Sequence, residues 1–236
     1  MKKLFAVIAL LFAVCSHAQL GTRIFGKDPI INLENFDKQR VHWGYFLGFN
    51  SYGFKFDYID TPEQDIIEKS TTGFNVGLVG NLRLFEHLDL RFEPGLYYTQ
   101  RNLTFPNIEG TETDRLREVK STYIHFPLLL KFSAKRAGNI RPYLVGGVSR
   151  TLNLSANSKA VDDNYSGRFR MKSWTNNYEL GFGIDLYFEY FKFSPSIRGV
   201  FGLDDEIIRD NVPDSQYTGN VGSMTTRAVL INFTFH

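Results

Sequence analysis

The chain has 236 residues, with 27 Lys and Arg residues, 25 Asp and Glu residues and an aromatic content of 15%. This length fits a single domain, and the near-balance of charge argues against a nucleic-acid-binding surface. Its apolar runs are shorter than the stretch of about 18 residues that a membrane-spanning helix requires. The many aromatic residues are therefore expected on strands that are apolar on one face.

The N-terminal residues 1–18 have the organisation of a secretory signal peptide. A basic start, Met1–Lys3, precedes the apolar stretch Leu4–Val14 and the small-x-small tripeptide Ser16–Ala18, after which cleavage is expected. The apolar stretch is too short for a membrane anchor, which needs about 20 residues. Cys15 is the only cysteine, and the bulky valine before it disfavours a lipoprotein acceptor. The mature chain is therefore expected to contain no disulfide.

Residues 19–41 are expected to form a periplasmic N-terminal arm ahead of the first strand. The segment mixes apolar and charged residues, and Asp28-Pro29 favours a turn. The arm is longer than closure of a sheet requires, so it could plug the interior, bind a partner or remain a loose terminus. Its candidate partner contacts are Asn32, Leu33, Phe36, Asp37 and Arg40.

Alternation of apolar and polar residues dominates the chain after the arm and predicts strands. In the clearest segment, Phe74 and Leu78 lie on one face while Asn75 and Asn81 lie on the other. The eight predicted strands are residues 42–58, 74–84, 88–98, 123–133, 142–154, 178–188, 191–201 and 229–235.

The first of these strands changes phase midway. Tyr45 and Phe49 share one face, whereas Tyr52 and Phe54 continue the apolar pattern in the opposite phase. A β-bulge near Asn50-Ser51 would produce such a shift, because it adds one unpaired residue to the strand.

The connections between the predicted strands alternate between long and short. Long polar links lie near residues 60–71, 104–118, 156–173 and 204–222, and short ones lie near 86–88, 136–140 and 189–191. Transmembrane barrels have this asymmetry, with short periplasmic turns, longer outer loops and an even number of strands. Residues 42–236 are therefore predicted to form an all-β fold: an eight-stranded antiparallel transmembrane β-barrel of OmpA/OmpX-like size in the cell outer membrane.

A water-soluble barrel, such as a lipocalin, would show the same periodicity with its faces reversed. The predicted signal peptide indicates export from the cytoplasm. The large apolar side chains on neighbouring strands would also overfill the interior of an eight-stranded barrel, which is only wide enough for packed side chains. We therefore expect the apolar faces to contact lipid, and the sheet to close so that its backbone groups are paired.

The polar faces of the predicted strands carry charges of both signs. The expected interior network consists of Arg83, Arg91, Glu93, Lys131, Glu179, Asp185 and Arg198. Buried charges are tolerated when they are paired and hydrogen-bonded. These side chains are therefore expected to fill the narrow lumen as a structural core and to leave no general pore. A relay or a gated peptide path is the functional alternative.

Candidate catalytic and metal-binding residues are sparse. The histidines of the mature chain do not have the mutual spacing of metal ligands. Ser121 and His125 share one face of a predicted strand, but no third residue that would orient them is evident. We therefore expect no catalytic residues, no metal site, no bound cofactor and no enzymatic activity.

Two segments at the start of the predicted barrel resemble PorT-type proteins. They are the arm-to-strand junction Asn32–Gly44 and the following Gly-and-aromatic segment Phe46–Asn50. Glu93–Leu96 and Tyr123–Leu129 are similar to segments in the wider group of such barrels. The resemblance covers essentially the whole mature chain, and its specific part is the junction.

The resemblance implies an outer-membrane barrel, SprT-like in gliding bacteria, that is required for type IX secretion. This system exports adhesins, proteases and gliding-motility surface proteins. The implied role is non-catalytic and depends on contacts with outer-membrane lipid and other type IX secretion components, with no nucleic-acid or small-molecule partner. The alternative is a stand-alone barrel, either an adhesin-like structural protein or, less favoured, a lipid-modifying enzyme.

Overall fold

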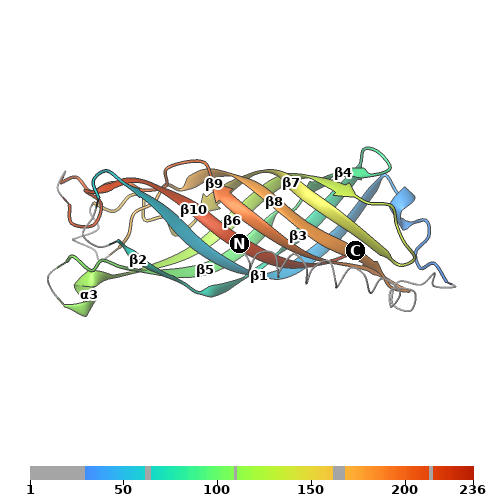
Figure 1. The fold of residues 1–236 in the computed structure, drawn as a ribbon, viewed down its shortest axis with the longest axis horizontal. Coiled ribbons are helices and arrows are strands. Elements are labelled where there is room, and N and C mark those ends of the chain that lie inside the picture. The colour runs from blue at the N-terminus through green and yellow to red at the C-terminus, as the bar shows by residue number, and fades with distance from the viewer. Residues whose placement is uncertain (1–29, 62–64, 109–110, 162–167, 213–214) are drawn as a thin grey trace, which may run out of the picture.

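The computed structural model describes residues 30–61, 65–108, 111–161, 168–212 and 215–236, so the predicted signal peptide lies outside the described residues. One antiparallel sheet contains ten strands (Figure 1). They are β1 (Val41–Tyr58), β2 (Ile67–Ser70), β3 (Thr72–Arg83), β4 (Leu88–Phe92), β5 (Gly95–Thr104), β6 (Leu116–Ser133), β7 (Ile140–Asn153), β8 (Trp174–Tyr187), β9 (Lys192–Gly202) and β10 (Val221–Phe235). The described helical elements are a 3-10 turn, η2 (Phe36–Lys38), and a one-turn helix, α3 (Glu112–Arg115). None of the helices in these ranges is long and apolar enough to cross a membrane.

The strands pair in a ring. β1 pairs with β10 on one side and with β3 on the other, so the first and last strands are neighbours. From β10 the order continues through β9, β8, β7 and β6, and β4 and β5 both lie between β6 and β3. Most strands therefore have hydrogen-bonded neighbours on both sides, which satisfies the backbone within the sheet.

Glu93-Pro94 separates β4 from β5. Proline has no N–H group to give to a ladder. The carbonyl oxygen of Pro94 still accepts a hydrogen bond from the Leu78 N–H at 3.0 Å, which holds the interrupted segment against β3. Gly95 then lets an aromatic ring approach, because a Cβ atom there would lie only 2.7 Å from Cζ of Phe46.

The two ends of the sheet differ in their connections. The short-turn end carries residues 84–87, 134–139 and 188–191 and the C-terminus. The long-loop end carries the described residues of the four other connections, 59–61, 65–66, 105–108, 111–115, 154–161, 168–173, 203–212 and 215–220. The order of long and short connections follows the prediction. The strands reach further toward the long loops than predicted: β6 begins at Leu116, β8 at Trp174 and β10 at Val221.

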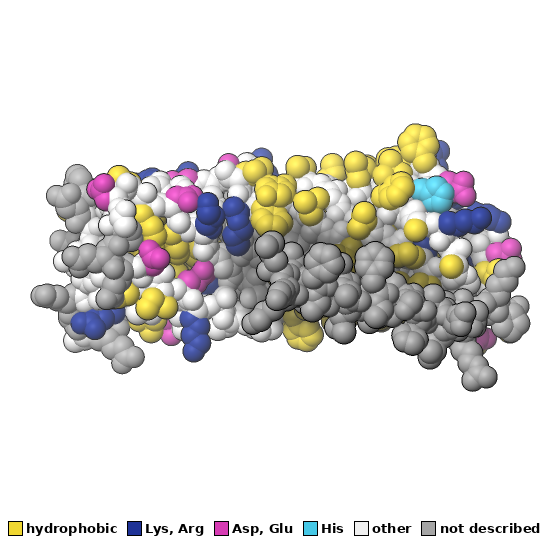
Figure 2. Space-filling view, viewed as in Figure 1, with side chains coloured by type: hydrophobic (Ala, Val, Ile, Leu, Met, Phe, Trp, Pro, Cys, Tyr) yellow, Lys and Arg dark blue, Asp and Glu magenta, His cyan; other side chains and the backbone are white. Residues whose placement is uncertain are grey.

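Near the short-turn end the apolar side chains point outward, as predicted. Trp43 of β1 is 73% exposed, and Phe182 of β8 is 57% exposed. Figure 2 shows hydrophobic side chains gathered over this part of the molecule and charged side chains scattered over the long-loop part. We call these outward residues the apolar belt; they include Trp43, Tyr45, Leu47, Phe49, Phe74, Leu78, Leu128, Leu130, Leu144, Val148, Leu180, Phe182, Val229 and Ile231.

Toward the long-loop end the two faces exchange character, and the bulge predicted at Asn50-Ser51 is wrong. One continuous register joins β1 to β10 through this point, and the register shifts at Asp57-Tyr58 instead. Past the belt the outward Lys55 is exposed, whereas the inward Phe54 is buried. The apolar pattern changes phase in the sequence because the surroundings of the strand change along its length. The strand itself is not interrupted at this point.

An apolar core fills the interior at the long-loop end. Its side chains come from four strands and from three of the long connections, so these connections fold inward over the end of the sheet. We call this group the outer core; it contains Phe54, Leu103, Phe105, Ile108, Val119, Phe169, Met171, Ile207, Tyr217, Val221 and Met224.

Candidate functional site

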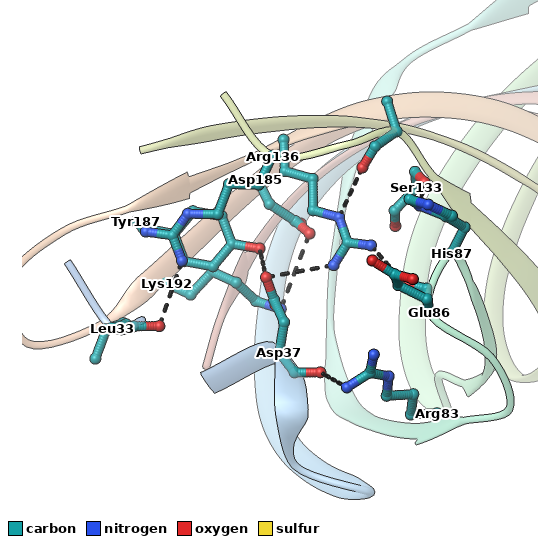
Figure 3. Close-up of polar contacts among 12 residues, drawn as sticks. Leu33, Asp37, Arg83, Glu86, His87, Ser133, Arg136, Asp185, Tyr187 and Lys192 are labelled. Carbon is teal, nitrogen blue, oxygen red and sulfur yellow. Dashed lines mark hydrogen bonds and ion pairs between the residues drawn. The ribbon is translucent and has the colours of Figure 1, made fainter. Parts of the chain in front are cut away.

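Residues 19–29 of the expected arm lie outside the described residues, and its described part, residues 30–40, crosses the short-turn end of the sheet. Figure 3 shows part of the contact between this segment and the sheet. The Asn32 backbone N–H donates to Oδ1 of Asn139 at 2.9 Å, and its Nδ2 donates to the carbonyl oxygen of Tyr187 at 3.1 Å. Arg136 donates to the carbonyl oxygens of Asn32 and Leu33, the latter at 3.3 Å. The backbone of the arm is thus fixed to the turn between β6 and β7 and to the end of β8.

Asp37 is the second anchor of the arm. The hydroxyl of Tyr187 donates to Oδ2 of Asp37 at 2.7 Å, and Nη1 of Arg141 lies 3.3 Å from the same oxygen. Nη1 of Arg83 donates to the Asp37 carbonyl oxygen at 2.7 Å. Side chains from β3, β7 and β8 therefore hold η2 against the sheet.

Phe36 covers the meeting point of the first and last strands. Its ring centroid lies 5.0 Å from that of His42 on β1 and 6.3 Å from that of the C-terminal His236. Nζ of Lys192 lies 4.6 Å from the centroid of the Phe36 ring. We call residues 30–40 the cap, because they close the short-turn end with one aromatic and several polar contacts.

The candidate partner contacts divide between the two sides of the cap. Asn32, Leu33, Phe36 and Asp37 are half-buried against the sheet. The side chain of Arg40 is exposed, and the Arg40 carbonyl oxygen accepts a hydrogen bond from the Arg83 N–H at 2.8 Å. The side of the cap that faces away from the sheet also carries Ile30 and Ile31, which are 71% and 54% exposed.

Behind the cap the interior holds a chain of ion pairs. Glu93 lies between two arginines: its Oε1 is 3.1 Å from Nη1 of Arg91, and its Oε2 is 2.7 Å from Nη1 of Arg198. Nε of Arg91 also donates to Oδ1 of Asn81 at 2.7 Å. These four side chains are buried, so each charge has its partners inside the sheet.

Arg198 extends this chain to Glu179. Nε of Arg198 lies 2.9 Å from Oε2 of Glu179, whose Oε1 lies 2.6 Å from Nε2 of His125. Nδ1 of His125 lies 2.8 Å from Oγ1 of Thr151. The contacts link β6, β7, β8 and β9 across the interior.

Asp185 forms a second centre nearer the cap. Nζ of Lys131 lies 2.8 Å and 2.6 Å from its two carboxylate oxygens, and the hydroxyl of Ser194 donates to Oδ1 at 2.6 Å. Nζ of Lys192 lies 3.9 Å from Oδ2. Because Lys192 also lies over Phe36, this centre connects the interior charges to the cap.

The structure brings six of the seven residues of the expected interior network together in these two buried centres, namely Arg91, Glu93, Lys131, Glu179, Asp185 and Arg198. Arg83 lies apart from them, because the last residue of β3 reaches the rim and bonds to the cap. Lys192 and His125 belong to the centres but not to the expected set. Their inward position follows from strand alternation, which is the signal that could have found them.

Arg101 is a buried charge that the sequence reasoning missed. Its guanidinium carbon lies 3.9 Å from the centroid of the Phe54 ring, and its Nη2 donates to Oγ of Ser121 at 3.2 Å. The predicted strand ends at Tyr98 and so does not include Arg101, whereas β5 continues to Thr104. Cation–π contact with aromatic rings partly replaces the hydration that this side chain loses.

Ser121 and His125 have separate partners. Ser121 accepts from Arg101, while His125 contacts Glu179 and Thr151. Within the described ranges, no group of three or more His, Cys, Asp or Glu residues is placed to hold a metal ion. The chemistry that this arrangement supports is the cross-linking of strands by paired charges, because a buried charge is stable only when it is paired.

Comparisons with known proteins cover most of the chain. The family described as outer membrane protein beta-barrel domain matches residues 18–207. OprG from Pseudomonas aeruginosa is 15% identical over 83% of this chain and 91% of that chain, with a TM-score of 0.42. Neisserial surface protein A is 7% identical over 83% of this chain and 98% of that chain, with a TM-score of 0.43. Among curated proteins no sequence matches the chain.

Proposed function

The chain belongs to the outer membrane protein beta-barrel domain family, and we propose that within this family it is an accessory outer-membrane component required for type IX protein secretion. The protein resides in the outer membrane. It acts there through contacts with outer-membrane lipid and with other type IX secretion components, without catalysis. Its dependent cargo would be adhesins, proteases and gliding-motility surface proteins.

In this proposal the sheet is an eight-stranded transmembrane barrel. We count β2 and β3, which Thr71 separates, as one strand, and β4 and β5, which Glu93-Pro94 separates, as another. The pairing of β1 with both β10 and β3 supports closure. The apolar belt is the surface that contacts lipid.

The observation that carries the proposal is the filled interior. The cap covers the short-turn end, ion pairs occupy the middle and the outer core fills the long-loop end. The interior of a small barrel is packed with side chains in this way. A filled interior favours a protein that acts through its outer surfaces over one that conducts solutes.

The link to type IX secretion rests on the resemblance of Asn32–Gly44 to PorT-type proteins. Within this segment Asn32, Phe36 and Asp37 attach the cap, and His42 receives the Phe36 ring. The segment that carries the resemblance therefore contains residues that attach the cap to the sheet and the His42 ring against which Phe36 packs. This coincidence supports the cap as the part on which export depends.

Deletion of the gene in its host tests the proposal directly. Proteins in the medium and on the cell surface are compared with those retained in the periplasm. We expect cargo with a C-terminal secretion signal to accumulate in the periplasm, and the cloned gene to restore export. Unchanged export in the deletion strain would refute the secretion role.

Removal of residues 20–40 from the cloned gene then tests the cap. We expect this variant to assemble in the outer membrane, as judged by heat-modifiable electrophoretic mobility, but to leave export blocked. Gln39→Ala is the matched control, because that exposed side chain lies on the cap, and it should restore export. Full export by the variant without the cap would show that export depends on another surface of the protein.

A stand-alone adhesin-like barrel is the second candidate. The observation in its favour is the long-loop end, which extends past the apolar belt and has a core of its own. Loss of the protein would then reduce surface attachment and leave export unchanged. A lipid-modifying enzyme, the least favoured alternative, would lose activity in Ser121→Ala or His125→Ala and tolerate removal of the arm.

A further inference from the structure

Two outward arginines stand where the apolar belt ends on the side of the long loops. On β7 and β10 the last belt residues in this direction are Val148 and Val229. Alternation along the strands makes Arg150 and Arg227 the next outward residues. On β1 the corresponding residue is the uncharged Ser51. Two strands of the sheet therefore place a permanent positive charge directly beside the apolar surface.

Arg150 lies over an aromatic ring that faces the same way. Its guanidinium carbon is 4.6 Å from the centroid of the Trp174 ring on β8. Both side chains are exposed on the outside of the sheet. A cation–π contact uses the flat face of the guanidinium, whereas the five N–H donors lie along its edge. The ring thus supports Arg150 and leaves that edge to a ligand.

Arg227 has a similar setting two strands away. Its guanidinium carbon lies 5.5 Å from the centroid of the Phe201 ring, and this ring stacks on Tyr178 at 4.9 Å. Nη1 of Arg227 donates to the carbonyl oxygens of Thr226 at 2.9 Å and Gly202 at 3.3 Å. These contacts fix the guanidinium on the outer surface through one of its three nitrogens, so the other two can serve an external acceptor.

The two arginines differ from a neighbouring outward lysine in their charge balance. Nζ of Lys120 on β6 lies 2.9 Å from Oε2 of Glu118. In the part of the chain that the structure describes, neither Arg150 nor Arg227 forms an ion pair with a carboxylate. Their charge is therefore available to an anion from outside the chain.

Aromatic side chains mark the depth at which these arginines lie. Tyr98, Tyr178 and Trp174 face outward along the same boundary and are exposed. Tyrosine and tryptophan are enriched where a membrane meets water, and transmembrane barrels carry such aromatic girdles. Figure 2 shows Lys and Arg side chains directly beside the hydrophobic ones where the belt gives way to the long-loop part. This is the level of lipid headgroups.

We propose that Arg150 and Arg227 bind the phosphate groups of anionic lipids at the long-loop boundary of the belt. A guanidinium can donate two parallel hydrogen bonds to one phosphate, and such charge-assisted bonds are strong. The location of the protein in the outer membrane identifies the occupant, because lipid headgroups adjoin the edges of any lipid-facing surface. The inference rests on the belt as that surface and does not depend on the secretion role.

Fluorescence of Trp174 tests the contact at Arg150. The chain has two tryptophans, so Trp43→Phe leaves Trp174 as the single reporter. The mature chain with this change is placed in phosphatidylcholine vesicles in which a constant small fraction of the phosphatidylcholine carries a nitroxide quencher on its headgroup. We expect the nitroxide to quench Trp174, because the ring and the headgroups lie at the same depth.

Partial replacement of the unlabelled phosphatidylcholine by anionic phosphatidylglycerol should then reduce the quenching. The anionic lipid should displace labelled lipid from Arg150 with a preference of about fivefold, the effect of one basic residue at a membrane surface. Arg150→Gln should abolish this preference, whereas Arg150→Lys, which keeps the charge, should retain it in part. Lys120→Gln is the matched control and should leave the preference unchanged.

Native mass spectrometry tests Arg227 without a reporter. The protein is released from micelles to which phosphatidylglycerol or phosphatidylcholine has been added. We expect phosphatidylglycerol to be retained at about fivefold lower lipid concentration than phosphatidylcholine. Arg227→Gln and Arg150→Gln should each reduce the retained phosphatidylglycerol, and the double variant should reduce it further. Lys120→Gln should not reduce it.

Several results would overturn the proposal. Absence of quenching at Trp174 would place the headgroups elsewhere along the sheet. A preference for phosphatidylglycerol that survives Arg150→Gln and Arg227→Gln, or that Lys120→Gln lowers equally, would remove the role of the two arginines. No preference in either experiment would make an acidic protein the better partner for these charges. Recovery of fluorescence with inorganic phosphate at the same concentration as the anionic lipid would indicate a site for soluble anions.

Discussion

The part of the sheet inside the apolar belt and the part beyond it are built in opposite ways. Inside the belt, residues such as Phe182 point outward and paired charges such as Glu179 and Arg198 fill the interior. Beyond the belt Lys55 points outward, and Met224 is buried in the outer core. The strands pass through both parts without changing their alternation. Strand geometry thus decides which residues share a face, and the surroundings decide what kind of residue each face carries.

The two interiors also differ in how they resist mutation. The stability of the ion-paired interior depends on particular partners, because removal of one partner leaves the other charge buried and unpaired. The outer core depends on filled volume, and its cost of truncation grows with the cavity that remains. Mutations of similar size in the two parts should therefore differ in how much they lower the free energy of unfolding and in how far along the sheet they raise hydrogen exchange.

Glu179→Ala should have the largest effect. It leaves Arg198 and His125 buried without their shared carboxylate, which should lower the free energy of unfolding by about 3–5 kcal/mol. Urea titration of the barrel in micelles measures this loss. Asn177→Ala, at a buried neutral residue two positions earlier, is the control and should cost about 1 kcal/mol. Equal losses would show that charge pairing does not distinguish the inner part.

Met224→Ala should have the next largest effect on the free energy of unfolding, and its effect on hydrogen exchange should be confined to the long-loop end. Truncation of this fully buried side chain should lower the free energy of unfolding by about 3 kcal/mol. Hydrogen exchange should rise at the long-loop end and stay unchanged within the belt. Met224→Leu, which conserves volume, should cost less than about 1.5 kcal/mol. Faster exchange at the short-turn end would contradict the separation of the two interiors.

Phe182→Lys tests the outer surface of the belt. A lysine on the lipid face should lower the free energy of unfolding in liposomes by about 2–4 kcal/mol, depending on its depth in the bilayer. The same change beyond the belt, Asn102→Lys, should stay within about 0.5 kcal/mol, because water solvates the new charge. Similar costs at the two positions would mean that the belt does not end where the outward residues become polar.

The smallest effect concerns pH and Glu206, which lies in the long connection between β9 and β10. Burial raises the pKa of its carboxyl group, so the folded protein binds this proton more tightly than the unfolded chain. The free energy of unfolding should therefore fall as pH rises from the ordinary value for Glu through the raised pKa. Glu206→Gln should weaken this dependence in urea titrations between pH 4 and 7. A steeper fall in the variant would contradict the assignment.

Period-2 alternation is a local property, and it predicted much of the inner part. The outward position of Phe182 and the inward position of Glu179 follow directly from it. The same rule led to the wrong bulge in β1, because it assumed that the apolar face stays on one side. Where the surroundings change along a strand, as between Phe49 and Phe54, a sequence pattern alone cannot distinguish a β-bulge from a change in which face of the strand is apolar.

The cap contacts could not be predicted, because they join distant parts of the chain. Asn32 meets Asn139, which is 107 residues away, and Asp37 meets Tyr187, which is 150 residues away. No periodicity in the arm encodes these partners. The sequence indicated only that the arm is longer than closure of the sheet requires. The structure shows which residues of the sheet its described part contacts.

The seat of the cap has a consequence for the order of assembly. Phe36 lies near the start of the described residues, yet its ring packs against His42, Lys192 and the last residue, His236. This seat exists only after β1 and β10 have come together, so a chain that lacks its final strand has nowhere to place the arm. The docked cap is therefore a mark of completed closure, because its contacts form only when the first and last strands are paired.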